Sequence, residues 1–210
     1  MTQVRAVLAR FFRLFVLAMG VALMAPTAAG AATPAEDYIQ SNIQRGLDIL
    51  NNRDLAADQR RDQFRALLES LTDLRRVALF TLGTAARTAS DADKDAFVAA
   101  FHDYAVAVYD QRLSHYNGQV MTVTGSTEHA PGDFVVHTTL TDRGKSNAVD
   151  FRVLGNDGRF TLMDASVEGI WLSLEERDQF AGFLGNHGGD IHALIQHLNE
   201  LTQQEEARRR

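Results

Sequence analysis

Apolar residues recur along the chain with a helical period, then with an alternating period, then with a helical period again. Spacings of three and four residues predict helices in the first part of the chain, over residues 35–51, 60–70, 74–82 and 90–117. Ser90 and Asp93 have the spacing of a capping box, which marks the start of the fourth and longest helix. After residue 171 the same spacing predicts two more helices, over 174–184 and 191–201.

Between these helical regions the apolar residues alternate with polar ones, which is the period of β-strands. The alternation predicts four strands, over residues 120–126, 134–141, 147–154 and 159–168. Glycine-containing turns separate them, so the strands form an antiparallel meander. The order of helices, sheet and helices predicts an α+β fold in which helices pack on a curved four-stranded antiparallel sheet.

The first 31 residues have the pattern of a signal peptide. Arg5, Arg10 and Arg13 precede an apolar run of eleven residues, 14–24, which is too short to span a bilayer. Small residues follow, and we expect cleavage after Ala31 or one residue later; the alternative is an uncleaved anchor. The chain is thus expected to comprise a signal peptide (1–31), one domain (32–204) and a charged tail (205–210), in the periplasm.

Composition narrows the classes of partner. The chain is 45% apolar and 23% charged, as in one ordinary globular domain, and it has no cysteine, so its core alone must hold it together. Its formal net charge of -6 becomes -9 when the three leader arginines are removed. An acidic domain lacks the basic surface that nucleic acid binding needs, so nucleic acid is not an expected partner.

Candidate chemistry is sparse. None of the phosphate-loop, dinucleotide, nucleophile-elbow or zinc-protease motifs occurs in the sequence. His187, His192 and His197 are five residues apart, or about 500° around a helix, so they do not share a face and predict no metal site. Asp150 or Asp164 could act as a general base, but strand carboxylates more often face solvent or pair with arginine. We therefore expect no enzyme activity and no cofactor.

Four segments, taken in order, resemble the MlaC family, the periplasmic phospholipid-binding component of an ABC-type lipid transport system. They are 73–90, with Asp73 and Gly83; the helix with Phe97, Phe101 and Tyr104; 167–180, which begins Val167-Glu168-Gly169-Ile170-Trp171; and the last helix after Gly188-Gly189. Three positions depart from the family pattern. Thr72 stands where phenylalanine is usual, Trp171 where serine is usual, and Thr84-Ala85-Ala86 where a bulky aromatic is usual.

The resemblance implies a carrier that encloses acyl chains in an apolar pocket between helices and sheet. Its cargo would be a phospholipid or, in one branch of the family, a hopanoid, and family members are also associated with toluene tolerance and outer-membrane lipid asymmetry. Its partners would be an inner-membrane ABC-type complex and an outer-membrane lipoprotein complex, and the carrier would act as a monomer. The competing functions are a periplasmic enzyme that uses a pocket carboxylate, and an adaptor protein that binds no lipid.

Periodicity nominates the residues that would line such a pocket, although each of them could equally belong to a packed core. From the helices they are Leu82, Phe97, Phe101, Tyr104 and Val108. From the sheet and the turn that closes it they are Val136, Phe151, Val153, Val167, Ile170, Trp171 and Phe180.

Overall fold

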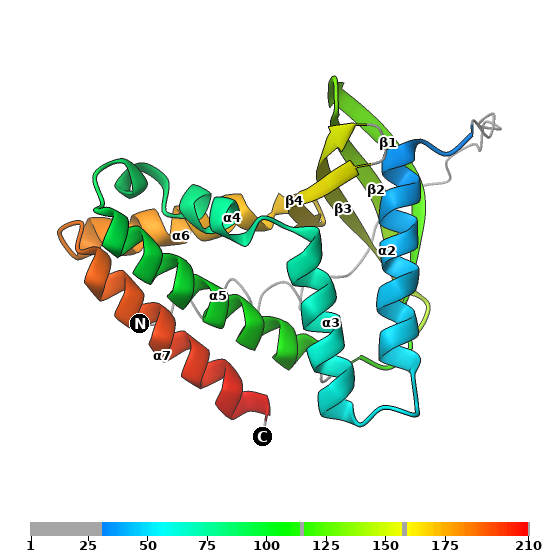
Figure 1. The fold of residues 1–210 in the computed structure, drawn as a ribbon, viewed down its shortest axis with the longest axis horizontal. Coiled ribbons are helices and arrows are strands. Elements are labelled where there is room, and N and C mark those ends of the chain that lie inside the picture. The colour runs from blue at the N-terminus through cyan, green and yellow to red at the C-terminus, as the bar shows by residue number, and fades with distance from the viewer. Residues whose placement is uncertain (1–30, 114–115, 157–158, 210) are drawn as a thin grey trace. The chain divides into compact units, whose positions relative to one another are not determined.

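One compact unit of the chain spans Ala32–Arg210. The computed structural model describes residues 31–113, 116–156 and 159–209 (Figure 1), so the predicted signal peptide lies outside the described residues except for Ala31. Helices precede and follow one antiparallel sheet, which confirms the predicted α+β class. Within the described residues, no helix combines the length and the apolar character needed to cross a bilayer.

The helices and strands follow the predicted order. Before the sheet come α2 (Pro34–Asn51), α3 (Ala57–Leu71), α4 (Leu74–Thr81), the short 3-10 helix η1 (Gly83–Arg87) and α5 (Asp91–Leu113). The strands are β1 (Val120–Ala130), β2 (Asp133–Asp142), β3 (Lys145–Asn156), β4 (Arg159–Val167) and β5 (Ile170–Trp171). The chain ends with α6 (Leu172–Asn186) and α7 (Ile191–Arg209).

The sheet is a meander in which each strand pairs with the next, in the order β1-β2-β3-β4-β5. The four long strands were predicted. The fifth has only two residues, which is too few to show an alternating pattern, and it pairs Ile170 and Trp171 with the end of β4. This short strand matters for the site, because it carries the chain from the sheet directly into α6.

One face of the sheet packs against α2 (Figure 1). Ala35 and Ile39 of α2 form a buried cluster with Val136 and Val153, which are both fully buried. The start of α2 is tied to β1, since the Thr33 hydroxyl accepts a hydrogen bond from the Glu36 N–H and lies 3.0 Å from the Ser126 hydroxyl. This face of the sheet is therefore filled by a helix.

A second core joins α4, α5, α6 and α7. At its centre the Phe180 ring meets Phe97 and Phe101 edge to face, with ring centroids 5.9 and 6.3 Å apart. Leu194 and Leu198 of α7 are fully buried beside α5. The sheet-side core and this helical core have separate sets of buried residues.

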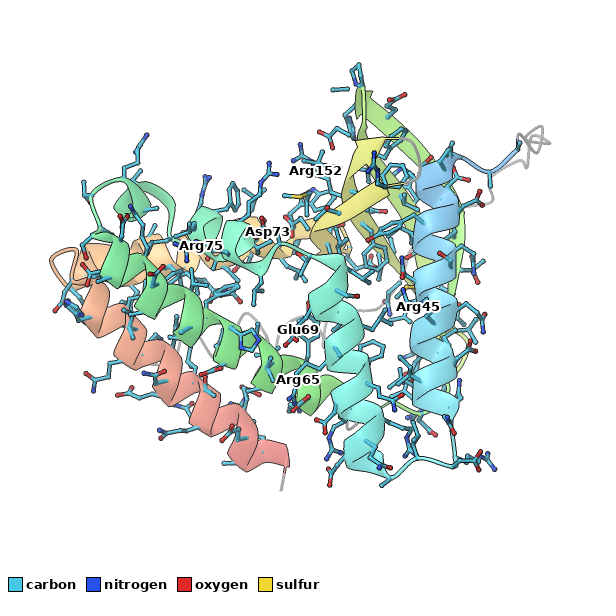
Figure 2. All side chains as sticks on the ribbon, in the orientation of Figure 1. Arg45, Arg65, Glu69, Asp73, Arg75 and Arg152 are labelled. Carbon is cyan, nitrogen blue, oxygen red and sulfur yellow. The ribbon has the colours of Figure 1, made fainter. Side chains whose placement is uncertain are left out.

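Two polar contacts join α3 to α5. Arg65 and Glu69 both extend from α3 (Figure 2). Arg65 donates to the buried Asp110 carboxylate of α5 at 2.7 Å, and Glu69 lies 2.9 Å from the His102 ring. Helix α3 also packs against α2, so it links the helix that covers the sheet to the helical core.

Candidate functional site

A cavity of about 460 Å³ lies between α4, the start of α6 and the face of the sheet that α2 does not cover. Its volume falls in the usual range for ligand pockets. The apolar part of its lining consists of Val77, Phe80, Val135, Leu154, Met163, Trp171 and Leu174. The polar part consists of Arg76, His129, Arg152, Asp164 and Ser173. An apolar wall with a group of charged side chains suits an amphipathic ligand.

Helix α4 contributes one wall of the cavity. Its N-cap Asp73 accepts a hydrogen bond from the Arg76 N–H at 3.0 Å, which fixes where the helix begins. Gly83 follows the helix with a φ of 63°, a conformation in which other residues are strained. The helical period then turns Ala78 into the helical core and leaves Arg76, Val77 and Phe80 on the cavity side.

The sheet contributes the opposite wall through strand alternation. Along β3, Val149, Phe151 and Val153 share one face, so Arg152 and Leu154 share the other. In β4 a bulge breaks the pairing, because Leu162 opposes Val153 while Asp164 opposes Arg152. The extra residue, Met163, lines the cavity next to Asp164.

Asp164 joins the sheet to α6. Its Oδ1 accepts hydrogen bonds from the N–H groups of Ala165, at 2.8 Å, and Ser173, at 3.1 Å. Its Oδ2 accepts from the Ser173 hydroxyl. Trp171, the N-cap residue of α6, makes no side-chain capping bond, so Asp164 caps the helix from the neighbouring strand. With both oxygens engaged in the cap, Asp164 is a structural group in this fold.

Exposed apolar side chains lie at the edge of the cavity. Phe80 is 42% exposed and Leu174 is 41% exposed, although both are large and apolar. The Arg177 guanidinium lies 5.1 Å from the centroid of the Phe80 ring, which is a cation–π distance. The cavity is therefore continuous with apolar surface that is open to solvent.

Arg152, labelled in Figure 2, is held at the sheet by a two-point ion pair with Asp133. Its Nε donates to Asp133 Oδ1 at 3.0 Å, and one Nη donates to Asp133 Oδ2 at 2.6 Å. These hydrogen bonds lower the pKa of Asp133 and raise the pKa of Arg152. Both groups therefore stay charged, and the guanidinium is fixed in orientation.

A row of polar side chains crosses the same face of the sheet outside the cavity. His137 Nδ1 lies 2.9 Å from Asp150 Oδ1, and His137 Nε2 lies 3.0 Å from the Thr127 hydroxyl. The Ser166 hydroxyl donates to Asp150 Oδ2 at 3.2 Å. Knowing which strands are neighbours and which residues share a face would have revealed this row.

Of the twelve residues nominated from periodicity, Trp171 lines this cavity. Those nominated from the helices, together with Phe180 of α6, belong to the helical core or pack against it: Leu82, Phe97, Phe101, Tyr104, Val108 and Phe180. Those from β2 and β3 belong to the core beneath α2: Val136, Phe151 and Val153. Val167 pairs with Ile170, and Ile170 is 41% exposed. Whether they line the cavity in a lipid-bound state stays a prediction.

The other lining residues were not nominated as such from the sequence, and they come from α4, the start of α6 and the four long strands: Arg76, Val77, Phe80, His129, Val135, Arg152, Leu154, Met163, Asp164, Ser173 and Leu174. The histidines form no metal cluster within the described residues. His187 and His197 instead stack on the Phe183 ring, with centroids 3.9 and 4.6 Å away. Burial lowers the pKa of His197. A second, more polar cavity of about 330 Å³ lies beside Arg65 and Asp110.

Two comparisons with known proteins bear on this site. The sequence model of the MlaC protein family matches residues 40–200, well over half of the chain. Among solved structures, the chain is similar to a phospholipid-binding protein from Ralstonia solanacearum, determined in complex with a phospholipid. The TM-score is 0.65 at 20% sequence identity, and the match covers 84% of this chain and 99% of that one. At this identity the likeness concerns the fold.

Proposed function

The chain belongs to the MlaC protein family, and from this premise we propose that it is a carrier that binds a phospholipid by its acyl chains. The observation that carries the proposal is the cavity between α4, α6 and the open face of the sheet, which combines an apolar wall with charged side chains. The likeness in fold to a protein solved with a bound phospholipid supports it. A carrier of this kind needs no catalytic residue.

The energetics explain why a carrier is needed. Exposing one methylene group to water costs about 0.8 kcal/mol, so a lipid with about thirty of them costs on the order of 20 kcal/mol to move unaided. A cavity that replaces water with apolar side chains removes most of this barrier. We propose that the carrier collects lipid at one membrane complex and delivers it to another across the periplasm.

The partners in this proposal are an inner-membrane ABC-type complex and an outer-membrane lipoprotein complex, with a monomeric carrier between them. The proposal also includes export with a cleaved leader, so the intact mass of the mature protein should correspond to a first residue of Ala32 or Thr33. A mature protein that retains Met1 would contradict the cleavage. The cargo is a phospholipid, with a hopanoid as the alternative.

Native mass spectrometry of the protein purified from bacterial envelopes tests the proposal directly. We expect an adduct with the mass of a two-chain phospholipid, which should disappear after extraction with organic solvent. Tandem fragmentation then identifies the headgroup, or a hopanoid in its place. Protein that is fully folded but carries no lipid, and takes up none from vesicles, would count against a carrier.

One observation favours an enzyme as the second candidate function. The His137 imidazole lies within hydrogen-bond reach of the Thr127 hydroxyl on one side and of the Asp150 carboxylate on the other, which is the arrangement of an activated nucleophile. None of the three lines the cavity, so a lipid held there would not meet the Thr127 hydroxyl. The carrier is therefore the better-supported function.

A further inference from the structure

Some charged side chains of the cavity already make hydrogen bonds or ion pairs within the protein, and others do not. Asp164 uses both carboxylate oxygens to cap α6, and Asp133, beside the cavity, is paired with Arg152. The side chain of Arg76 is exposed and makes no hydrogen bond or ion pair within the described part of the chain. Both carboxylates are thus already bonded, whereas the positive charge of the cavity is only partly neutralised.

An unpaired arginine is unexpected at this place. The domain after the leader carries a formal charge of -9, so carboxylates are in excess over cations. The neighbouring Arg75, on the same helix, follows that trend and pairs with Asp95 at 2.7 Å. Arg76 instead lines the cavity, where Asp164 is the one carboxylate among the described lining residues and is engaged at α6.

Arg152 supports a binding role for this group of cations. Its pairing with Asp133 uses Nε and one Nη, so the remaining Nη can donate to a ligand. The pairing also holds the guanidinium plane still, so little side-chain entropy is lost when a ligand binds. His129, on β1, lines the same cavity and adds a third nitrogen-bearing side chain.

We propose that Arg76, together with Arg152 and His129, binds the phosphate group of the phospholipid whose acyl chains occupy the apolar part of the cavity. The inference rests on the proposed function. Guanidinium groups match phosphate oxygens in charge and geometry, and a charge-assisted hydrogen bond is about twice as strong as a neutral one.

The arrangement recognises the phosphate rather than the group attached to it. Recognition of an ammonium headgroup would need a free carboxylate, and Asp133 and Asp164 are both engaged. The site therefore favours a phosphate-bearing lipid over a phosphate-free glycolipid with the same chains. Among phospholipids, it accepts those with an anionic headgroup at least as well as zwitterionic ones.

A competition experiment measures this preference. The mature protein is incubated with vesicles of equal parts phosphatidylglycerol and digalactosyldiacylglycerol with identical acyl chains, and native mass spectrometry gives the ratio of the two bound lipids. We expect the wild-type protein to favour phosphatidylglycerol by about tenfold or more, the worth of one charge-assisted hydrogen bond. Because both lipids come from the same vesicle, attraction of the protein to the membrane does not affect the ratio.

Variants at two adjacent positions assign the preference to the site. Arg76→Gln should lower the ratio several-fold while total lipid uptake persists, because Arg152 and His129 remain, and Arg76→Lys should restore part of it. Arg75→Gln removes the same charge from the same helix but away from the cavity, and should leave the ratio unchanged. Thermal melts confirm that each variant is folded; Arg76 is exposed, so we expect no loss of stability.

Three results would overturn the inference, and they are distinguishable from a failure of the carrier function. A wild-type ratio near one, or a ratio that Arg76→Gln does not change, removes the phosphate site but leaves a lipid carrier. Arg76-dependent binding of inorganic phosphate alone, with a lipid ratio near one, assigns the cations to a free anion. Uptake of neither lipid by the folded protein instead contradicts the proposed function itself.

Discussion

Asp164 in β4 caps α6 by accepting hydrogen bonds from both the N–H and the hydroxyl of Ser173. The contact is buried on the side of Ser173, which is 8% exposed. Because β4 belongs to the sheet and α6 to the helical core, this pair fixes the position of the helical core relative to the sheet. It also stands in the wall of the cavity, so the same contact shapes the proposed site.

The first prediction concerns this cap. Asp164→Ala should lower the free energy of unfolding by about 1–3 kcal/mol, because it leaves the buried Ser173 N–H without an acceptor. Ser173→Ala, which removes only the hydroxyl, should cost less. Urea denaturation at neutral pH measures both.

The matched control is Asp178→Ala, which removes a carboxylate from an exposed position of α6. It should change the unfolding free energy by no more than about 0.5 kcal/mol. If Asp164→Ala is no more costly than Asp178→Ala, then Asp164 does not act as the cap of α6.

The order of helices and strands was predictable because local residues determine it. The Ser90 side chain accepts from the Asp93 N–H at 3.1 Å, as its capping-box spacing predicted, and α5 begins at Asp91. The glycine-containing turns indicated where each of the four long strands ends. The two-residue strand β5 could not be predicted, since it exists only by pairing with β4.

The cavity was less predictable, because alternation shows which residues share a face but not what covers that face. The alternation correctly grouped Phe151 with Val153, but α2, from far earlier in the chain, packs on that side. The cavity uses the opposite face, whose Arg152 and Leu154 look like ordinary surface residues in the sequence. The bulge that places Met163 beside Asp164 also depends on pairing between strands.

The second prediction is that substitutions in the cavity affect lipid binding, whereas substitutions in the core beneath α2 affect stability. Met163→Trp adds bulk to a half-buried residue of the cavity wall, so it should reduce the lipid that copurifies with the protein by at least about half. Its thermal midpoint should stay near that of the wild type, because the cavity has room for the ring. Native mass spectrometry and thermal melts measure the two effects.

The comparison variant is Val153→Trp, since Val153 is fully buried beneath α2. Overpacking at such a position costs about 1–3 kcal/mol, so this variant should be clearly destabilised. A Met163→Trp protein that melts normally and carries full lipid would show that acyl chains do not use this cavity.

The third prediction tests the enzyme alternative. Thr127→Val removes the hydroxyl that contacts His137 Nε2, at an exposed position where little stability is at stake. As a carrier, the variant should take up lipid normally and should restore detergent resistance to a deletion strain as well as the wild type does. Asp150→Asn should do the same if it remains folded, although it weakens contacts with both His137 and Ser166.

One outcome would contradict this prediction. If Thr127→Val melts and binds lipid as the wild type does, yet fails to complement, the row of polar side chains has a role of its own. Release of free fatty acid by the wild-type protein, and not by the variant, would then identify that role as ester hydrolysis.

The fourth prediction is a pH dependence of stability at the contact between α3 and α5. Burial opposes the charged form of His102, but hydrogen bonds with Asp103 and Glu69 outweigh it, so the pKa of His102 lies above its usual value of 6.5. A raised pKa in the folded state stabilises the fold below the unfolded pKa, and this contribution is lost as the pH rises through the folded value.

Unfolding free energies should therefore be higher at about pH 6 than at about pH 9, and this difference should shrink in His102→Gln. Added salt should weaken the effect, because the three side chains are partly or largely exposed. An undiminished pH dependence in His102→Gln would place its source elsewhere in the chain.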